Sequence, residues 1–306
     1  MKVSMLFKQV AIGVGVSAVL VGTAMADPIA SFDYTQEFEF VEPIAPAGVN
    51  KEGSTSGVSA VDGYTKLSWG TESNSFDEIS SLVINPQAGD STTPSGALSA
   101  GNLAVSTSVN AVTFGLGPTV VHNNFVITGQ SLDSATAQDN VVLSPFGGGD
   151  DQVQAITFGI DFEETSNNPA NPGACPEGVA FTAGVGCGDI FALSGGLLGL
   201  PTILNGSIVA FLIDTFNIDD YFYDVYITSP GLDVLSDEAC VEVGGAGNEG
   251  CIGFTTFENQ SNAFALAFAI VAREAAIPEP ATIALLAGSL LLMGLVRRRK
   301  VSSLSA

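Results

Sequence analysis

Alternation of apolar and polar residues constrains the fold of this chain more than any other feature. From Ile156 to Phe162 every second residue is large and apolar, and the residues between them are small or polar. A β-strand turns successive side chains to opposite faces, whereas a helix repeats about every 3.6 residues. The same spacing returns in 221–227 and 263–270. We therefore expect an all-β protein.

Short turn-forming segments separate the predicted strands. Gly, Pro, Asn and Asp gather in 147–151 and 168–173, and 208–213 is apolar on both faces, as in a strand that is covered on both sides. Many short strands with such turns indicate an antiparallel β-sandwich, and a jelly-roll variant stays open. We expect a mobile N-terminal segment over 27–63, followed by one sandwich domain over 64–276.

The N-terminal segment 1–26 has the composition of a secretory signal peptide. Two lysines precede an apolar run over 10–21, and Ala24 and Ala26 form a small-residue cleavage site. A run of about 12 apolar residues is shorter than the roughly 20 that a stable membrane span needs. We expect a signal helix that signal peptidase removes.

The C-terminal segment 277–306 is expected to contain a short transmembrane helix. Its parts are a Pro-Glu-Pro motif, an apolar run and a basic cluster: Pro278, Glu279 and Pro280; 281–296; Arg297, Arg298 and Arg299. The prolines keep the motif extended, and the basic cluster holds the tail on the cytoplasmic side. A helix of about 16 residues rises about 24 Å, less than a hydrocarbon core of about 30 Å, which suits a transient insertion into the inner membrane.

These three C-terminal parts resemble the PEP-CTERM sorting signal. The resemblance implies that an exosortase-type enzyme cuts near the motif and releases or transfers the preceding domain. A plain membrane anchor stays open as the alternative. Both arrangements place 27–276 outside the cytoplasm.

The exported part of the chain is strongly acidic. The whole chain has 32 Asp and Glu residues and a net charge of -23, and only Lys51, Lys66 and Arg273 are basic between 27 and 276. This charge excludes nucleic acid and anionic membrane surfaces as electrostatic partners. The acidic residues are scattered, and the sequence contains no EF-hand loop, so no cofactor is expected. Weak calcium binding at a site assembled from distant loops stays open.

Four cysteines lie in the exported part, an even number in an oxidising compartment, which favours disulfides over metal ligation. The expected pairs are Cys175 with Cys187 and Cys240 with Cys251, because each pair flanks a loop rich in Gly. Closing a loop of that size stabilises the fold by about 3 kcal/mol in the chain-entropy model.

Candidate catalytic residues are few. His122 is the single histidine, and we expect it to be a buried or half-buried hydrogen-bonding residue beside Asn124 rather than a base or a metal ligand. No G-x-S-x-G or C-x-x-C motif occurs in the sequence. A glycosidase with two carboxyl groups stays open, and Asp161, Glu163 and Glu164 come nearest to a cluster.

Six segments between 64 and 272 resemble, as an ordered set, the THxN family of PEP-CTERM proteins. They are Leu67–Gly70, Ser80–Ile84, Val121–Asn124, Phe162–Thr165 with Asn167, Cys187–Phe191 and Gly253–Glu258. Val121 stands where the family has Thr, whereas His122 and Asn124 match its motif. The family implies no established activity. Trp69 in the first segment is expected to pack in the core, and a platform for sugars stays open.

These observations predict a secreted protein without catalysis that is sorted to the cell surface or to an extracellular polysaccharide matrix. Its expected partners are signal peptidase, the exosortase-type enzyme and extracellular polysaccharide. A carbohydrate-binding module is the first alternative, and a glycoside hydrolase is the second.

Overall fold

The computed structural model describes residues 27–55, 63–72, 78–85, 98–167, 172–195, 201–245 and 251–275. Apart from Asp27, they belong to one compact unit, Pro28–Ala275. The predicted signal helix with Ala24 and Ala26, and the predicted transmembrane helix with its sorting motif, lie outside the described residues. Within those ranges, the structure contains no helix with the length and apolarity that crossing a membrane requires.

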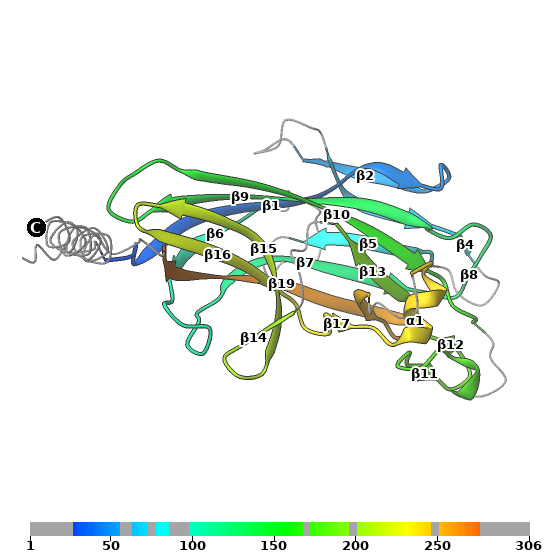
Figure 1. Ribbon diagram of the computed structural model, residues 1–306. Coiled ribbons are helices and arrows are strands. Elements are labelled where there is room, and N and C mark those ends of the chain that lie inside the picture. Colours follow the sequence, from blue (N-terminus) through cyan, green and yellow to red (C-terminus); the bar gives the residue numbers. More distant parts are fainter. Residues whose placement is uncertain are drawn as a thin grey trace, which may run out of the picture. The chain divides into compact units, whose positions relative to one another are not determined.

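Antiparallel strands make up most of the described chain (Figure 1). The first ten are β1 (Ser31–Ala45), β2 (Asn50–Thr55), β3 (Gly63–Trp69), β4 (Thr71–Glu72), β5 (Ser80–Asn85), β6 (Leu98–Ala104), β7 (Gly115–Asn124), β8 (Ile127–Thr128), β9 (Ser134–Pro145) and β10 (Gln152–Glu163). The others are β11 (Phe181–Thr182), β12 (Gly186–Cys187), β13 (Ile190–Ser194), β14 (Thr202–Leu204), β15 (Ile208–Ile218), β16 (Tyr221–Thr228), β17 (Asp233–Val234), β18 (Ile252–Thr255) and β19 (Gln260–Glu274). A 3-10 turn, Pro172–Ala174, and the helix α1 (Asp237–Glu242) complete the described elements.

Fifteen strands form one continuous sheet in the order β14-β15-β16-β19-β7-β5-β3-β1-β9-β10-β13-β18-β17, with β2 beside β3 and β6 beside β1. The pairs β4–β8 and β11–β12 stand apart from it. The all-β, antiparallel prediction is therefore confirmed.

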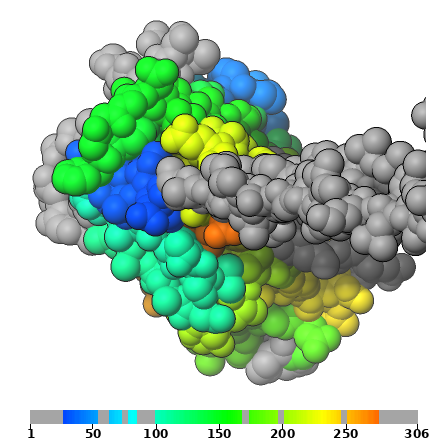
Figure 2. Space-filling model, turned by 60° about the vertical axis from the view of Figure 1, so that its left-hand side comes forward, coloured from blue at the N-terminus to red at the C-terminus, as the bar shows by residue number. Residues whose placement is uncertain are grey.

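Side chains from the two halves of this sheet pack against each other. The ring of Phe32 on β1 lies 5.6 Å from that of Tyr223 on β16, and the ring of Tyr34 lies 4.7 Å from that of Phe268 on β19. The space-filling view likewise shows the N-terminal strand, in blue, among segments from the middle and the end of the chain (Figure 2). The two layers expected of a sandwich thus belong to one continuous sheet.

The predicted strands 156–162, 221–227 and 263–270 lie in β10, β16 and β19. Phe268 and Ile270 on β19 enter the main core between the layers, while Ala269 on the opposite face belongs to a second, smaller core. Likewise β15 buries Phe211 in the main core and Ala210 in the smaller one. Both faces of β15 are covered, as its apolar sequence predicts.

The prediction of a mobile segment over 27–63 is wrong for residues 31–55, which form β1 and β2. Strand β1 pairs with β9 along one edge and with β6 and β3 along the other. Phe32, Tyr34 and Phe40 alternate along it and are buried. This segment has the same period of two as the strands that were recognised, so the domain begins near residue 28 rather than 64.

Candidate functional site

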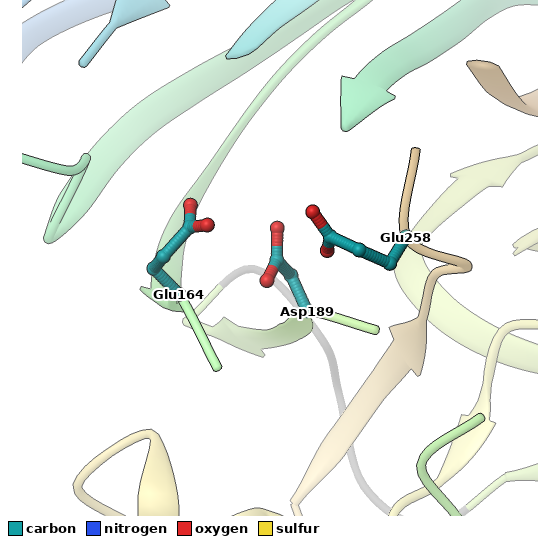
Figure 3. Close-up of side chains that lie close together, drawn as sticks. All are labelled: Glu164, Asp189 and Glu258. Carbon is teal, nitrogen blue, oxygen red and sulfur yellow. The ribbon is translucent and has the colours of Figure 1, made fainter. Parts of the chain in front are cut away.

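Three carboxylates from separate parts of the chain meet at one end of the sheet. Glu164 follows β10, Asp189 precedes β13, and Glu258 lies in the turn between β18 and β19. One oxygen from each lies within 4.8 Å of the other two, and Figure 3 shows Asp189 between the other two side chains. We call these three residues the acidic cluster.

The register of the sheet brings these residues together. Strands β10, β13 and β18 are neighbours, and the Cα pairs Glu163–Ile190 and Ile190–Thr255 align their ends. The chain also passes very close to itself here, because a Cβ on Gly188 would collide with the carbonyl oxygen of Thr256. Glycine at 188 permits this approach.

Two threonines hold Asp189 in place. The backbone N–H of Thr165 donates to Oδ1 of Asp189 at 3.1 Å, and the backbone N–H of Asp189 donates to Oγ1 of Thr256 at 3.1 Å. The hydroxyl of Thr165 donates to the carbonyl of Cys187 at 2.8 Å. The Asp189 backbone and one of its carboxylate oxygens are therefore fixed by neutral donors and acceptors.

Several buried polar atoms at the cluster lack a hydrogen-bond partner among the described residues. They are Oε2 of Glu164, Oδ2 of Asp189, both carboxylate oxygens of Glu258, Oδ1 of Asn124 and both ring nitrogens of His122. His122, Asn124 and Asp189 are fully buried, and Glu258 is 2% exposed. Most buried polar groups in proteins have a partner, so this concentration of unpartnered atoms sets the cluster apart.

His122 on β7 is enclosed by aromatic rings. It stacks on Trp69 with ring centroids 5.8 Å apart, and its ring meets the edge of Phe191 at 4.8 Å. Its Nε2 lies 3.8 Å from Oδ2 of Asp189, which is too long for a hydrogen bond. Burial lowers the pKa of His122 to about 3, so the ring is neutral and forms no ion pair.

Trp69 and Asn124 act on the other two carboxylates. Desolvation raises the pKa of Glu164 and of Glu258, and the Trp69 indole and the Asn124 amide each offset a small part of that rise, although neither contact has the geometry of a full hydrogen bond. Asn167 donates to Oε1 of Glu164 at 3.2 Å. Trp69 is 2% exposed, so its indole cannot form a surface platform for sugars, in keeping with the expected core position.

Burial raises the pKa of all three carboxyl groups. Desolvation and the nearby charge of Glu258 raise the pKa of Glu164 to about 7, and desolvation raises that of Glu258 to about 7. The pKa of Asp189 is raised well above its usual value, first by desolvation and then by the charges of Glu164 and Glu258. Three negative charges are therefore unfavourable here unless a positive charge joins them.

A pocket of about 700 Å³ adjoins the cluster, and Glu164 forms part of its wall. Its other lining residues are Glu163, Thr165, Ser166, Gly173, Ala174, Cys175, Pro176, Cys187, Asp237, Glu238, Val241 and Glu242. The disulfides pair Cys175 with Cys187 and Cys240 with Cys251, as predicted. One cross-links the pocket wall, and the other holds α1, which also lines the pocket.

The structure separates the three acidic candidates at the C-terminal end of β10. Glu164 joins the acidic cluster, whereas Asp161 lies outside it and Glu163 only lines the pocket. His122, Asn124 and Trp69 lie beside the cluster. Asp189 and Glu258 were not among the candidates, because each stands alone in the sequence.

No protein-family model matches this chain, and neither does any curated protein.

Proposed function

We propose that this protein is exported and sorted to the cell surface or to an extracellular polysaccharide matrix, where it acts without catalysis. The two disulfides are the observation that carries this proposal. Disulfides form and persist in oxidising compartments, and the part of the chain that the structure describes contains no free cysteine. Both bonds stabilise loops around the acidic pocket.

The two ends of the sequence support the export route. The signal peptide with its Ala24 and Ala26 site would direct the chain through the inner membrane. The PEP-CTERM-like segment would then anchor it transiently until an exosortase-type enzyme cuts near Pro278-Glu279-Pro280. The family resemblance to THxN proteins belongs to the same proposal.

Burial keeps two of the three carboxylates of the acidic cluster away from a sugar polymer. A glycosidase needs an acid and a second carboxylate on either side of the scissile bond. Asp189 and Glu258 are buried and do not line the pocket, so a sugar polymer in the pocket would reach only Glu164 of the cluster.

Carbohydrate binding in the pocket is a second candidate function. Glu163, Asp237 and Glu242 line the pocket, and carboxylates accept hydrogen bonds but donate none when ionised. The pocket therefore favours a ligand rich in hydroxyl donors, such as a neutral polysaccharide, over an acidic one.

Replacing Pro278-Glu279-Pro280 by three alanines tests the sorting proposal. The native protein should be recovered from the cell surface or medium without the residues beyond about 280, as measured by intact mass. The triple variant should remain at full length in the inner membrane, because its signal peptide is unchanged. A variant that is released and trimmed like the native protein would contradict the proposal.

Glycan arrays and a reducing-sugar assay on the purified exported protein separate the remaining functions. Binding without sugar release would support the carbohydrate-binding module. Release of reducing sugar, lost in Glu164→Gln, would establish the hydrolase and overturn the proposal of a protein without catalysis.

A further inference from the structure

We propose that Glu164, Asp189 and Glu258 bind one divalent cation and that calcium is the ion their chemistry fits. The inference goes beyond the proposed function, since neither export nor a matrix role requires a metal ion. It rests on charge balance, on the unpartnered atoms and on the type of donor at the cluster.

The charge of the cluster cannot be balanced by the basic residues of this domain. Lys51, Lys66 and Arg273 are the only Lys and Arg residues between 27 and 275. They form ion pairs with Glu42, Glu52 and Asp224, respectively. Each basic side chain is thus engaged elsewhere, so the three carboxylates need protons or a cation from solution.

The unpartnered atoms lie together, as the ligands of a single ion would. Four carboxylate oxygens of the cluster and Oδ1 of the fully buried Asn124 lack partners. Each of the three carboxylate groups has an oxygen within 4.8 Å of the other two, and a single central ion can span this spacing. A cation at this point would satisfy atoms whose burial without a partner is otherwise costly.

The donors select a hard cation. Calcium takes six to eight oxygen ligands, including carboxylates bound through one or both oxygens, and the three carboxylates can supply several of them. Magnesium usually keeps several waters and binds through one or two carboxylates. Zinc prefers nitrogen and sulfur ligands in a tetrahedral arrangement, and the single histidine lies outside the group of mutually close ligand atoms.

His122 and Trp69 form part of the shell around the three ligands. Nε2 of the neutral imidazole lies 3.8 Å from Oδ2 of Asp189, and the imidazole ring stacks on Trp69. The shell around a metal site controls solvent access and the local dielectric. These rings therefore affect metal affinity without touching the ion.

The ion would exchange through the pocket. Glu164 is the member of the cluster that also lines the pocket, whereas Asp189 and Glu258 are enclosed. We therefore expect the ion to enter and leave past Glu164.

Calcium titration of the chelator-treated, full exported protein tests the site. Calorimetry should give one ion per chain. The melting temperature should rise by about 5 to 10 °C at roughly a hundredfold excess of calcium over Kd. The same melting temperature in calcium and in chelator would overturn the proposal.

Glu258→Gln and Asp189→Asn remove one charge each while keeping the size of the side chain. In both variants calcium should no longer raise the melting temperature. In chelator both variants should melt no lower than the native protein, because one buried charge is gone. Asp161→Asn, on the outward face of β10, is the matched control and should keep the full rise. Retention of the rise in Glu258→Gln would overturn the assignment even if Asp189→Asn failed to fold.

Terbium luminescence gives a second measurement that does not depend on stability. Trp69 is the only tryptophan in the chain, so excitation at the red edge of the indole band should sensitise terbium bound beside it. Calcium should displace this signal, and Glu258→Gln should lack it. Displacement by zinc but not by calcium would overturn the choice of a hard cation.

Discussion

Two buried acidic regions of this domain differ in how their charge is balanced. Asp139 on β9 lies alone in the interior, and the amide of Gln36 on β1 donates to both of its oxygens, at 3.0 and 2.8 Å. The acidic cluster places three carboxylates together and leaves four of their oxygens without partners. Burial raises the pKa of Asp139 to about 7, as it does for Glu164 and Glu258.

The comparison shows that a raised pKa does not by itself mark a binding site. At Asp139 the fold supplies a neutral donor, and a single proton suffices to remove the charge. At the cluster the fold supplies few donors, and three protons would be needed. Two properties distinguish a site for an ion from a single buried carboxyl group. Several charges lie close together, and few donors of the fold pair with them.

The largest effect expected is on the pH dependence of stability. The folded protein holds the protons of Glu164 and Glu258 more tightly than the unfolded chain does. In chelator, the stability should therefore be highest below about pH 4.5 and should fall as the pH rises to about 7, by about 3 kcal/mol for one such group. Urea unfolding at a series of pH values measures this loss.

Calcium should oppose this loss, because the ion replaces the protons of the cluster. Part of the fall should remain, since Asp139 titrates in the same direction whether or not calcium is present. Identical pH profiles in chelator and in calcium would remove the distinction between the two regions.

Replacing His122 by alanine should have the next largest effect. Removing a buried ring that packs on Trp69 and Phe191 should destabilise the protein by about 3 kcal/mol, through lost packing rather than lost hydrogen bonds. Calcium affinity should fall by about tenfold or more, because Asp189 loses part of the shell that excludes water from it. His122→Phe keeps an aromatic ring at this position, so it should recover much of the stability in urea unfolding and much of the calcium affinity measured by calorimetry.

Asp139→Asn should act on the other region alone. Above the pKa of Asp139 the substitution removes a buried charge, so it should raise the stability by about 2 kcal/mol near pH 8 and change it little near pH 5. The amide can still pair with Gln36, whose Oε1 is unpartnered. Calorimetric titration should give the native calcium affinity, and a lost calcium response would show that the two regions are coupled.

The smallest effect is expected for Asp161→Asn. This side chain lies on the face of β10 opposite to Phe162 and is outside the cluster, so the unfolding free energy should change by no more than about 0.5 kcal/mol. A large change in urea unfolding would mean that the overall acidity of the domain, rather than the arrangement at the cluster, governs its stability.

The sequence predicted individual strands better than their assembly. Alternation in 156–162 identified β10 because the pattern reports which face of a strand is buried. It does not report which strand covers that face. The union of the two layers depends on the contact between β1 and β3, whose register includes the pair Phe40–Tyr64, and no local spacing encodes a pairing of this kind.

The candidate site was predictable only in part for a similar reason. Glu164 was recognisable as a carboxylate beside other carboxylates at the end of a strand. Asp189 and Glu258 each stand alone in a turn, and only the register of β10, β13 and β18 brings them to Glu164. The sequence led us to expect buried positions for His122 and Trp69, and both are buried, but it did not show that they lie beside the carboxylates.

The position of β19 has a consequence for when this chain can fold. It is the last strand described, yet it lies inside the sheet, between β16 and β7. A growing chain that ends before residue 260 leaves β16 and β7 each unpaired along one edge and the core open, and the many distant pairings make folding slow. The domain can therefore be completed only when nearly the whole chain is available. If the chain crosses a membrane in the unfolded state, this delay would keep it from folding before its passage is complete.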